Sequence, residues 1–167
     1  QTDAPVETYR ILETLPHDVN DYTEGLFIHD GYLYEATGEY GKSRLKKSNL
    51  ATGEVICERC LDARYFGEGA AAIDDKVYRL TYLSTHGFIY RADDLELEST
   101  FRYPGQGWGL TTDGKHLIMS NGSAAILFLD PRTCKVEHYI VVEDAYSEVG
   151  FLNELQYVDG EIYANVW

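Results

Sequence analysis

The sequence predicts an all-β protein of the β-propeller type, because its turns and strands repeat at a nearly fixed interval. A turn followed by a short strand recurs every 40–45 residues or so, about the length of one four-stranded propeller blade. The four copies begin at Asp30, Asp74, Asp113 and Asp159. Aromatic residues make up 13% of the chain and favour strands, and no segment carries a convincing apolar stripe at the helical period. A β-sandwich would also supply short strands, but they would not repeat in this phase.

A second set of turns lies between the first, so each repeat holds two hairpins. The Asp-Gly pairs in the first set are typical of tight hairpin turns. The second set begins at Asn49, Ala92 and Asp130, and the strands after it keep one phase at Val55, Leu97 and Val136. Each complete repeat is therefore expected to supply four short strands.

In chain order, residues 7–15 are expected to form one isolated strand, which a propeller would use as the outer strand of its last blade. Three complete blades are expected near residues 22–62, 66–103 and 107–142. A fourth blade begins near residue 150 and contributes two strands before Trp167. We interpret residues 1–167 as a single propeller domain that is incomplete at its C-terminus. The open sheet edges of such a chain favour self-association.

The charge balance bears on partners and location. A formal net charge of −14 would repel a phosphate backbone, so neither nucleic acid nor an anionic membrane surface is an expected partner. No apolar run approaches the roughly 18 residues needed to span a bilayer. The polar start, Gln1-Thr-Asp-Ala-Pro-Val, reads as a short remnant of a processed leader. It favours an extracellular or periplasmic protein.

No cofactor or metal is expected from the spacing of the usual ligands. Cys57 and Cys60 lie in an alternating strand-like stretch, and a zinc site would need a second ligand pair, whereas Cys134 stands alone. The five histidines are scattered, with no pair at i, i+4 and no flanking set of carboxylates. There is also no glycine-rich phosphate loop and no Gly-x-Ser-x-Gly elbow.

The candidate site comes from the residues that open the first strand of each blade. Aligned by repeat phase, the equivalent positions are held by Glu24, Glu68, Trp108 and Asn153. The innermost strands of a propeller ring its central channel, so these side chains should converge at one mouth of the channel. The glycines beside them permit close approach of neighbouring backbones. The alternative interpretation is that the glycines serve blade packing and the polar groups are solvated at the rim.

Several strings resemble those of the glutamine cyclotransferases of plants and bacteria. They are Phe66-Gly-Glu-Gly, Gly107-Trp-Gly-Leu-Thr-Thr-Asp-Gly, Leu152-Asn-Glu-Leu and Ile162-Tyr-Ala-Asn-Val-Trp. The resemblance covers nearly the whole chain from Pro16 onward. It implies a five-bladed β-propeller, here about three and a half blades plus one N-terminal strand. The implied enzyme is an aminoacyltransferase that converts the N-terminal glutamine of peptides or proteins to pyroglutamate and releases ammonia.

The resemblance also implies roles for particular residues. Glu68 would act as general acid and base, and Asn153 would polarise the carbonyl of the substrate side chain. The remaining candidates would bind the substrate: Glu24, Phe66, Tyr82, Trp108 and Trp167. No metal is implied in the reaction.

The chain departs from the family pattern in ways that favour a second hypothesis. Glu24 stands where the family usually has glutamine, Tyr82 where it has tryptophan, and Gln106 where it has glutamate. The family's final region, with a Thr-Gly-Lys segment whose lysine reaches the site, lies outside these 167 residues, so we expect the chain to be either a fragment or a shortened relative. A propeller with weak or no catalytic activity that serves as a binding module is therefore the alternative function. A carbohydrate-active or calcium-binding propeller is a third, less favoured because no Asp-rich loop is present.

Overall fold

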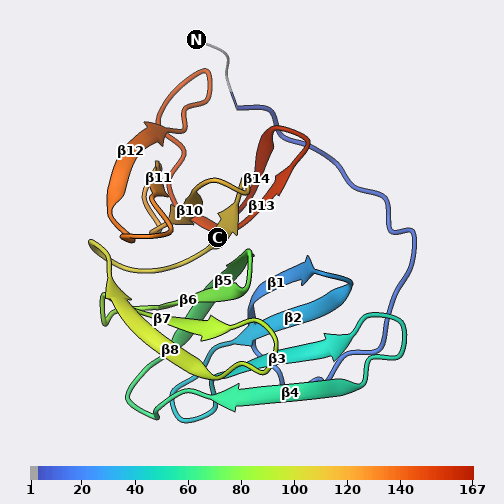
Figure 1. Ribbon diagram of the computed structural model, residues 1–167. Coiled ribbons are helices and arrows are strands. Elements are labelled where there is room, and N and C mark those ends of the chain that lie inside the picture. Colours follow the sequence, from blue (N-terminus) through green and yellow to red (C-terminus); the bar gives the residue numbers. More distant parts are fainter. Residues whose placement is uncertain (1–3) are drawn as a thin grey trace.

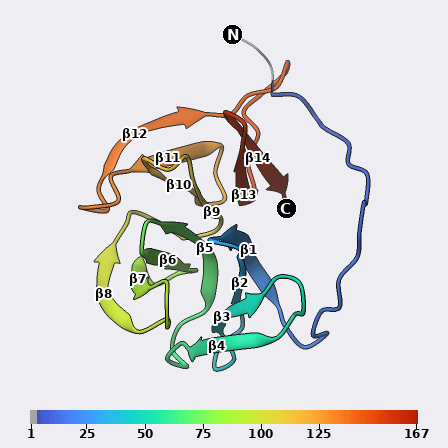
Figure 2. The same ribbon diagram turned by 45° about the vertical axis from the view of Figure 1, so that its right-hand side comes forward.

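The computed structural model describes residues 4–167, which form four antiparallel sheets placed one after another around a common axis (Figure 1). Each complete sheet is a meander in which strands neighbouring in sequence are neighbours in space. β1, β5, β9 and β13 lie nearest the centre, and β4, β8 and β12 lie outermost (Figure 2). No helix occurs among the described residues, so the expected all-β architecture is confirmed.

The strand bounds agree with the blades expected from the repeats. The first sheet contains β1 (Thr23–His29), β2 (Tyr32–Thr37), β3 (Arg44–Asn49) and β4 (Val55–Cys60). The second contains β5 (Gly67–Ile73), β6 (Lys76–Thr81), β7 (His86–Arg91) and β8 (Leu97–Arg102). The third contains β9 (Leu110–Thr112), β10 (Leu117–Ser120), β11 (Ala125–Leu129) and β12 (Val136–Val141). The fourth is a hairpin of β13 (Leu152–Val158) and β14 (Glu161–Val166).

Turn chemistry explains why the first hairpin of a blade recurs. Asp30 and Gly31 both have positive φ angles, 49° and 79°, and they alone join β1 to β2. Asp159 and Gly160 repeat this geometry between β13 and β14, at 51° and 92°. Two positive φ angles in a two-residue loop match the twist of the flanking strands, and Asp-Gly adopts them at low cost. The Asp-Gly signal read from the sequence is thus confirmed.

The expected strand at residues 7–15 is wrong. These residues pair with no other strand, and their side chains are exposed to solvent; Tyr9, for example, is 88% exposed. The segment runs around the outside from the neighbourhood of β12 and β14 to the start of β1 (Figure 2). Near its beginning the Ala4 N–H donates to the Glu143 carbonyl at 3.0 Å. A strand-like sequence becomes a strand only where a partner ladder pairs its backbone groups. Here no sheet strand of the described chain pairs with it.

Apolar clusters between consecutive sheets fix the inner strands relative to one another. The first two sheets share a cluster that includes Tyr34, Leu45, Val77 and Leu95. The second and third sheets meet around Leu80, Leu110, Leu117 and Met119. The third and fourth meet around Ile118, Ile126, Leu152 and Leu155. Close packing of this kind holds side chains from different sheets in register at the axis.

Two further expectations concern the cysteines and the chain start. Cys57 and Cys60 lie on β4 and form no disulfide, which agrees with their interpretation as ordinary strand residues. Cys134 is also free and lies buried in the turn before β12. The described residues include no helix of the length and apolarity needed to cross a membrane. Gln1, Thr2 and Asp3 of the expected leader lie outside the described residues.

Candidate functional site

The inner strands approach one another so closely that glycine is required between them. A Cβ atom placed on Gly69 would lie 2.5 Å from the Leu110 nitrogen, and one on Gly109 would lie 2.2 Å from the Asn153 carbonyl oxygen. A Cβ on Gly25 would lie 2.8 Å from the Ala70 nitrogen. Ordinary carbon contacts are longer than any of these distances. The glycines beside the candidate residues therefore let the starts of the inner strands converge.

Irregular register at the start of three inner strands displaces the candidate side chains from the regular alternation. In β1 the pairing shifts between Thr23 and Gly25, and Glu24 lies at the shift. In β5 it shifts between Gly67 and Ala70, which includes Glu68. In β13 it shifts between Leu152 and Leu155, which includes Asn153 and Glu154. β-Bulges re-aim side chains and are common beside functional sites.

Glu68 and Glu24 form a coupled pair of carboxyl groups. Glu68 is only 7% exposed, and this burial is the main cause that raises its pKa to about 9. The charges of Glu24 and Glu154 raise it further, and Glu68 shares a hydrogen bond with Glu24 that favours the proton on Glu68. Burial also raises the pKa of Glu24, to about 7. Two like charges in a dry site cannot both ionise readily, so the pair titrates as one unit.

Glu154 is a third buried carboxyl that sequence reasoning missed. Both of its oxygens are buried and make no hydrogen bond within the described chain. Burial raises its pKa well above the usual value; the backbone N–H groups of Leu26 and Leu110 oppose this rise without reaching hydrogen-bond geometry. Repeat alignment could have found it. The position after the candidate residue is glycine in the first three blades, where the backbones converge, and Glu154 in the fourth.

One buried cation faces this acidic cluster. Arg79, on β6, is fully buried, and its Nη2 donates to the Thr37 carbonyl at 2.7 Å, while Nε and Nη1 make no hydrogen bond within the described chain. Burial lowers the pKa of Arg79 to about 10, and its charge opposes the rise in the pKa of Glu68. A Cβ on Gly67 would lie 2.0 Å from Nη2, so the guanidinium packs against the backbone directly before Glu68.

Aromatic rings from successive blades form a continuous arc. Phe66 is in edge contact with Tyr22, Tyr40 and Tyr82, with ring centroids 6.2, 5.5 and 6.1 Å apart. The arc continues from Tyr82 to Trp108 at 6.4 Å and from Trp108 to Trp167 at 6.2 Å. The arc thus brings four of the candidate residues together: Phe66, Tyr82, Trp108 and Trp167. Trp167 is 80% exposed, so the arc opens to solvent at this end.

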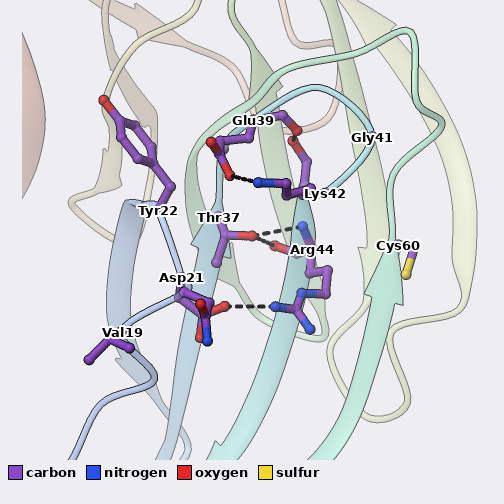
Figure 3. Close-up of a pocket in the computed structure, with 12 residues that line it drawn as sticks. Val19, Asp21, Tyr22, Thr37, Glu39, Gly41, Lys42, Arg44 and Cys60 are labelled. Atoms are coloured by element: carbon purple, nitrogen blue, oxygen red, sulfur yellow. Dashed lines mark hydrogen bonds and ion pairs between the residues drawn. The ribbon is translucent and has the colours of Figure 1, made fainter.

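Two hollows border this region, and they differ in chemistry. One, of about 530 Å³, is lined by aromatic and amide side chains that include Tyr82, Gln106, Trp108, Asn121 and Trp167. The other, of about 650 Å³, lies beside the first sheet and is shown in Figure 3. Its charges are already paired, Arg44 with Asp21 and Lys42 with Glu39, each at 2.9 Å. The aromatic hollow is therefore the better candidate for a substrate, although the other one is larger.

We expect Glu154→Gln to flatten the pH dependence of stability. Because the folded pKa of Glu154 lies above its unfolded value near 4.5, the folded state binds more protons than the unfolded state above that pH. The wild-type free energy of unfolding should therefore fall as the pH rises above about 5. Glutamine cannot ionise, so the free energy of unfolding of the variant should fall less between pH 5 and pH 9 than that of the wild type.

Urea unfolding at pH 5, 7 and 9 measures this difference. Glu13→Gln is the matched control, since Glu13 is exposed on the N-terminal segment. Parallel stability curves for wild type and Glu154→Gln would contradict the expected burial of a neutral acid.

A family model described as glutamine cyclotransferase matches residues 1–167. The glutaminyl-peptide cyclotransferase of Arabidopsis thaliana is 37% identical over 164 residues, which cover 97% of this chain and 51% of that protein. This chain thus spans about half the length of the curated relative. The crystal structure of Myxococcus xanthus glutaminyl cyclase aligns with a TM-score of 0.85 and 30% identity, covering 95% of this chain and 67% of that one.

More distant solved structures support the fold alone. The WD40 domain of Neurospora crassa Pan2 aligns with a TM-score of 0.63 at 9% identity, covering 86% of this chain and 46% of that one. WD40 repeats form β-propellers. The expected β-propeller architecture is therefore confirmed.

Proposed function

The chain belongs to the glutamine cyclotransferase family, and from that premise we propose that it cyclises the N-terminal glutamine of peptides or proteins to pyroglutamate and releases ammonia. One observation supports this activity above the others. A buried carboxyl, Glu68, is coupled to a second carboxyl, Glu24, and Glu24 lies with the Phe66 ring of the aromatic arc against Gly38. Such a site offers proton transfer next to a surface that can hold a small, bent side chain.

The reaction requires one proton to move between two nitrogens. The α-amine of the substrate attacks the carbon of its own side-chain carboxamide, so a new C–N bond forms while the bond to the amide nitrogen breaks. The amine loses a proton, and the departing nitrogen gains one as ammonia leaves. We assign both transfers to Glu68, which takes the proton as a base and returns it as an acid. In this proposal no metal takes part.

The remaining candidate residues position the substrate and stabilise charge. Asn153 can donate one N–H of its side-chain amide to the carboxamide oxygen as negative charge develops on it. Phe66, Tyr82, Trp108 and Trp167 would hold the glutamine side chain folded back on its amine, which lowers the entropic part of the barrier. The N–H of the Trp108 indole donates to Gln106 Oε1 at 2.9 Å, which steadies the ring at the centre of the arc.

The titration of the carboxyl pair allows Glu68 to accept and return a proton, but it restricts the pH range in which Glu68 can act as a base. Because burial and mutual repulsion raise the pKa values of this coupled pair, its two protons leave in separate steps, and the pair holds one proton between those steps. The shared hydrogen bond favours that proton on Glu68, where it blocks the base. Arg79 acts in the opposite direction and favours an ionised Glu68.

Glu24→Gln should therefore raise kcat/KM near neutral pH rather than lower it. Removing one of two neighbouring carboxyls lowers the pKa of the survivor, and each unit of decrease gives about a tenfold larger base fraction below that pKa. The pH profile of kcat/KM should keep its shape while its rising limb moves to lower pH. A fall of tenfold or more in turnover would show instead that Glu24 is a working member of the site.

The proposed function is tested by incubating the protein with glutaminyl-2-naphthylamide and measuring released ammonia and the cyclised product by mass spectrometry. Ammonia and pyroglutamyl product in equal amounts would support the enzyme. The second candidate function, a binding module, is favoured by Glu24 and Tyr82, which depart from the family pattern. Saturable binding of glutaminyl peptides without any ammonia would establish that alternative and refute catalysis.

A further inference from the structure

Two histidines and a glutamate meet on the third sheet, away from the carboxyl cluster. Their ligand atoms, on His116, Glu137 and His138, all lie within 4.8 Å of one another. We propose that these three side chains bind a divalent transition-metal ion of the zinc type. Imidazole nitrogen and carboxylate oxygen are the ligands that such ions take, and two histidines with one glutamate form an established three-ligand set.

The sheet brings these residues together although 20 residues lie between His116 and Glu137. His116 directly precedes β10, and Glu137 and His138 lie on β12, with β11 between the two strands. Phe128 of β11 serves as a platform for both imidazoles. The His138 ring stacks on it with centroids 4.3 Å apart, and the His116 ring meets its edge at 5.8 Å.

His116 is held in the orientation that a metal ligand needs. Its Nδ1 lies 2.9 Å from Asp113 Oδ2, and Asp113 Oδ1 accepts from the backbone N–H groups of Lys115 and His116. A carboxylate on Nδ1 favours the tautomer that leaves the Nε2 lone pair free, which is the arrangement of carboxylate–histidine–metal triads. Asp113 is thus a positioning residue in this proposal.

The distance between two of the ligand atoms fits a tetrahedral ion. His116 Nε2 lies 3.3 Å from Glu137 Oε2. Two ligands bound at about 2.0–2.1 Å to a tetrahedral ion are separated by about 3.3–3.4 Å. The His116 side chain is 12% exposed and that of Glu137 is 51% exposed, so the group is anchored on one side and open to solvent on the other. A water molecule could complete the coordination from the open side.

A second cluster of similar residue types differs from this one in its neighbouring cations. His17, Asp21 and Glu35 also lie within 4.8 Å of one another. There, however, Lys46 forms ion pairs with both carboxylates and Arg44 lies 2.9 Å from Asp21. Two fixed cations already neutralise those carboxylates and would repel an added ion. In the described part of the chain, no lysine or arginine pairs with Asp113 or Glu137.

The location of the site implies a structural role. His116 is four residues from Ser120, or about 13 Å along an extended strand. Ser120 lies at the end of β10 near the axis, where its hydroxyl donates to the Asn153 carbonyl at 2.7 Å. An ion at His116 would therefore tie β10 to β12 near the other end of the sheet. It would not take part in the proposed cyclisation, and the proposal does not depend on that activity.

Zinc binding to the tag-free chain tests the inference, measured by competition with a chromophoric chelator and by the visible spectrum of the Co²⁺ form. We expect one ion per chain, a four-coordinate cobalt spectrum and a higher Tm with zinc. His138→Gln should weaken binding at least about tenfold, and Asp113→Asn about 10- to 100-fold. His17→Gln, from the second cluster, is the matched control and should bind as wild type does.

Three results would overturn the inference: no stoichiometric binding by wild type, unchanged affinity in His138→Gln, or a matching loss in His17→Gln. The structural role has a separate readout, because removing zinc with EDTA should lower Tm while leaving any turnover unchanged. Loss of turnover that zinc alone restores would contradict the structural role.

Discussion

Glu68→Gln should lower kcat by about 10²- to 10⁴-fold, the usual contribution of a positioned general acid or base. Glutamine has nearly the same shape as glutamate but can neither take the proton of the attacking amine nor return it to the leaving ammonia. The protein should remain folded. The replaced carboxyl is one whose pKa is raised to about 9, chiefly by burial. Because the folded pKa lies above the unfolded value near 4.5, this carboxyl lowers the free energy of unfolding above about pH 5, and removing it should not lower stability at pH 8.

Steady-state rates of ammonia release and urea unfolding at pH 8 separate loss of chemistry from loss of fold. Glu13→Gln again supplies the matched control, because it makes the same chemical change on an exposed segment. If the activity of Glu68→Gln stays within a few-fold of wild type, a group other than Glu68 transfers the proton. Glu24, the coupled neighbour, would then be the first residue to test.

Asn153→Ala should lower kcat by about 10²- to 10³-fold with a much smaller change in KM. The amide would donate to an oxygen that carries negative charge only as the carboxamide is attacked, so its contribution belongs to the transition state. The backbone around it should be preserved, since the contact from Ser120 Oγ is to the Asn153 carbonyl and not to its side chain.

Asn121→Ala is the matched control for this change. Asn121 lines the aromatic hollow, and its Oδ1 accepts from the Ser123 backbone N–H and hydroxyl, which gives it a local structural role. Its kcat should stay within a few-fold of wild type. An Asn153→Ala variant that changes KM alone would show that the amide binds the substrate without stabilising the transition state.

Much of the fold could be read from the chain because hairpin turns are local. The Asp-Gly pairs at Asp30 and Asp159 require positive φ angles and so mark the first hairpin of a blade wherever they occur. Once the blades were aligned, the convergence of Glu24 and Glu68 followed from the geometry of a ring. The prediction of a strand at residues 7–15 was wrong because strand formation is not local. A strand depends on a partner strand that its own residues do not specify.

The electrostatic character of the site came only from the tertiary structure. As single residues, Glu154 and Arg79 carry no sequence motif, yet one adds a third buried carboxyl and the other a buried cation. The cluster of His116, Glu137 and His138 likewise forms across a sheet and follows no sequence spacing.

By itself, then, the sequence determined the repeat, the order of the strands and which residues open each inner strand, because turn and strand preferences act over a few neighbouring residues. Only the tertiary structure decided which of those groups are buried, which share a proton and which carry an opposing charge. The physical reason is that desolvation and Coulomb interactions depend on distance through space and on the exclusion of water. Neither quantity is encoded at any one position of the chain.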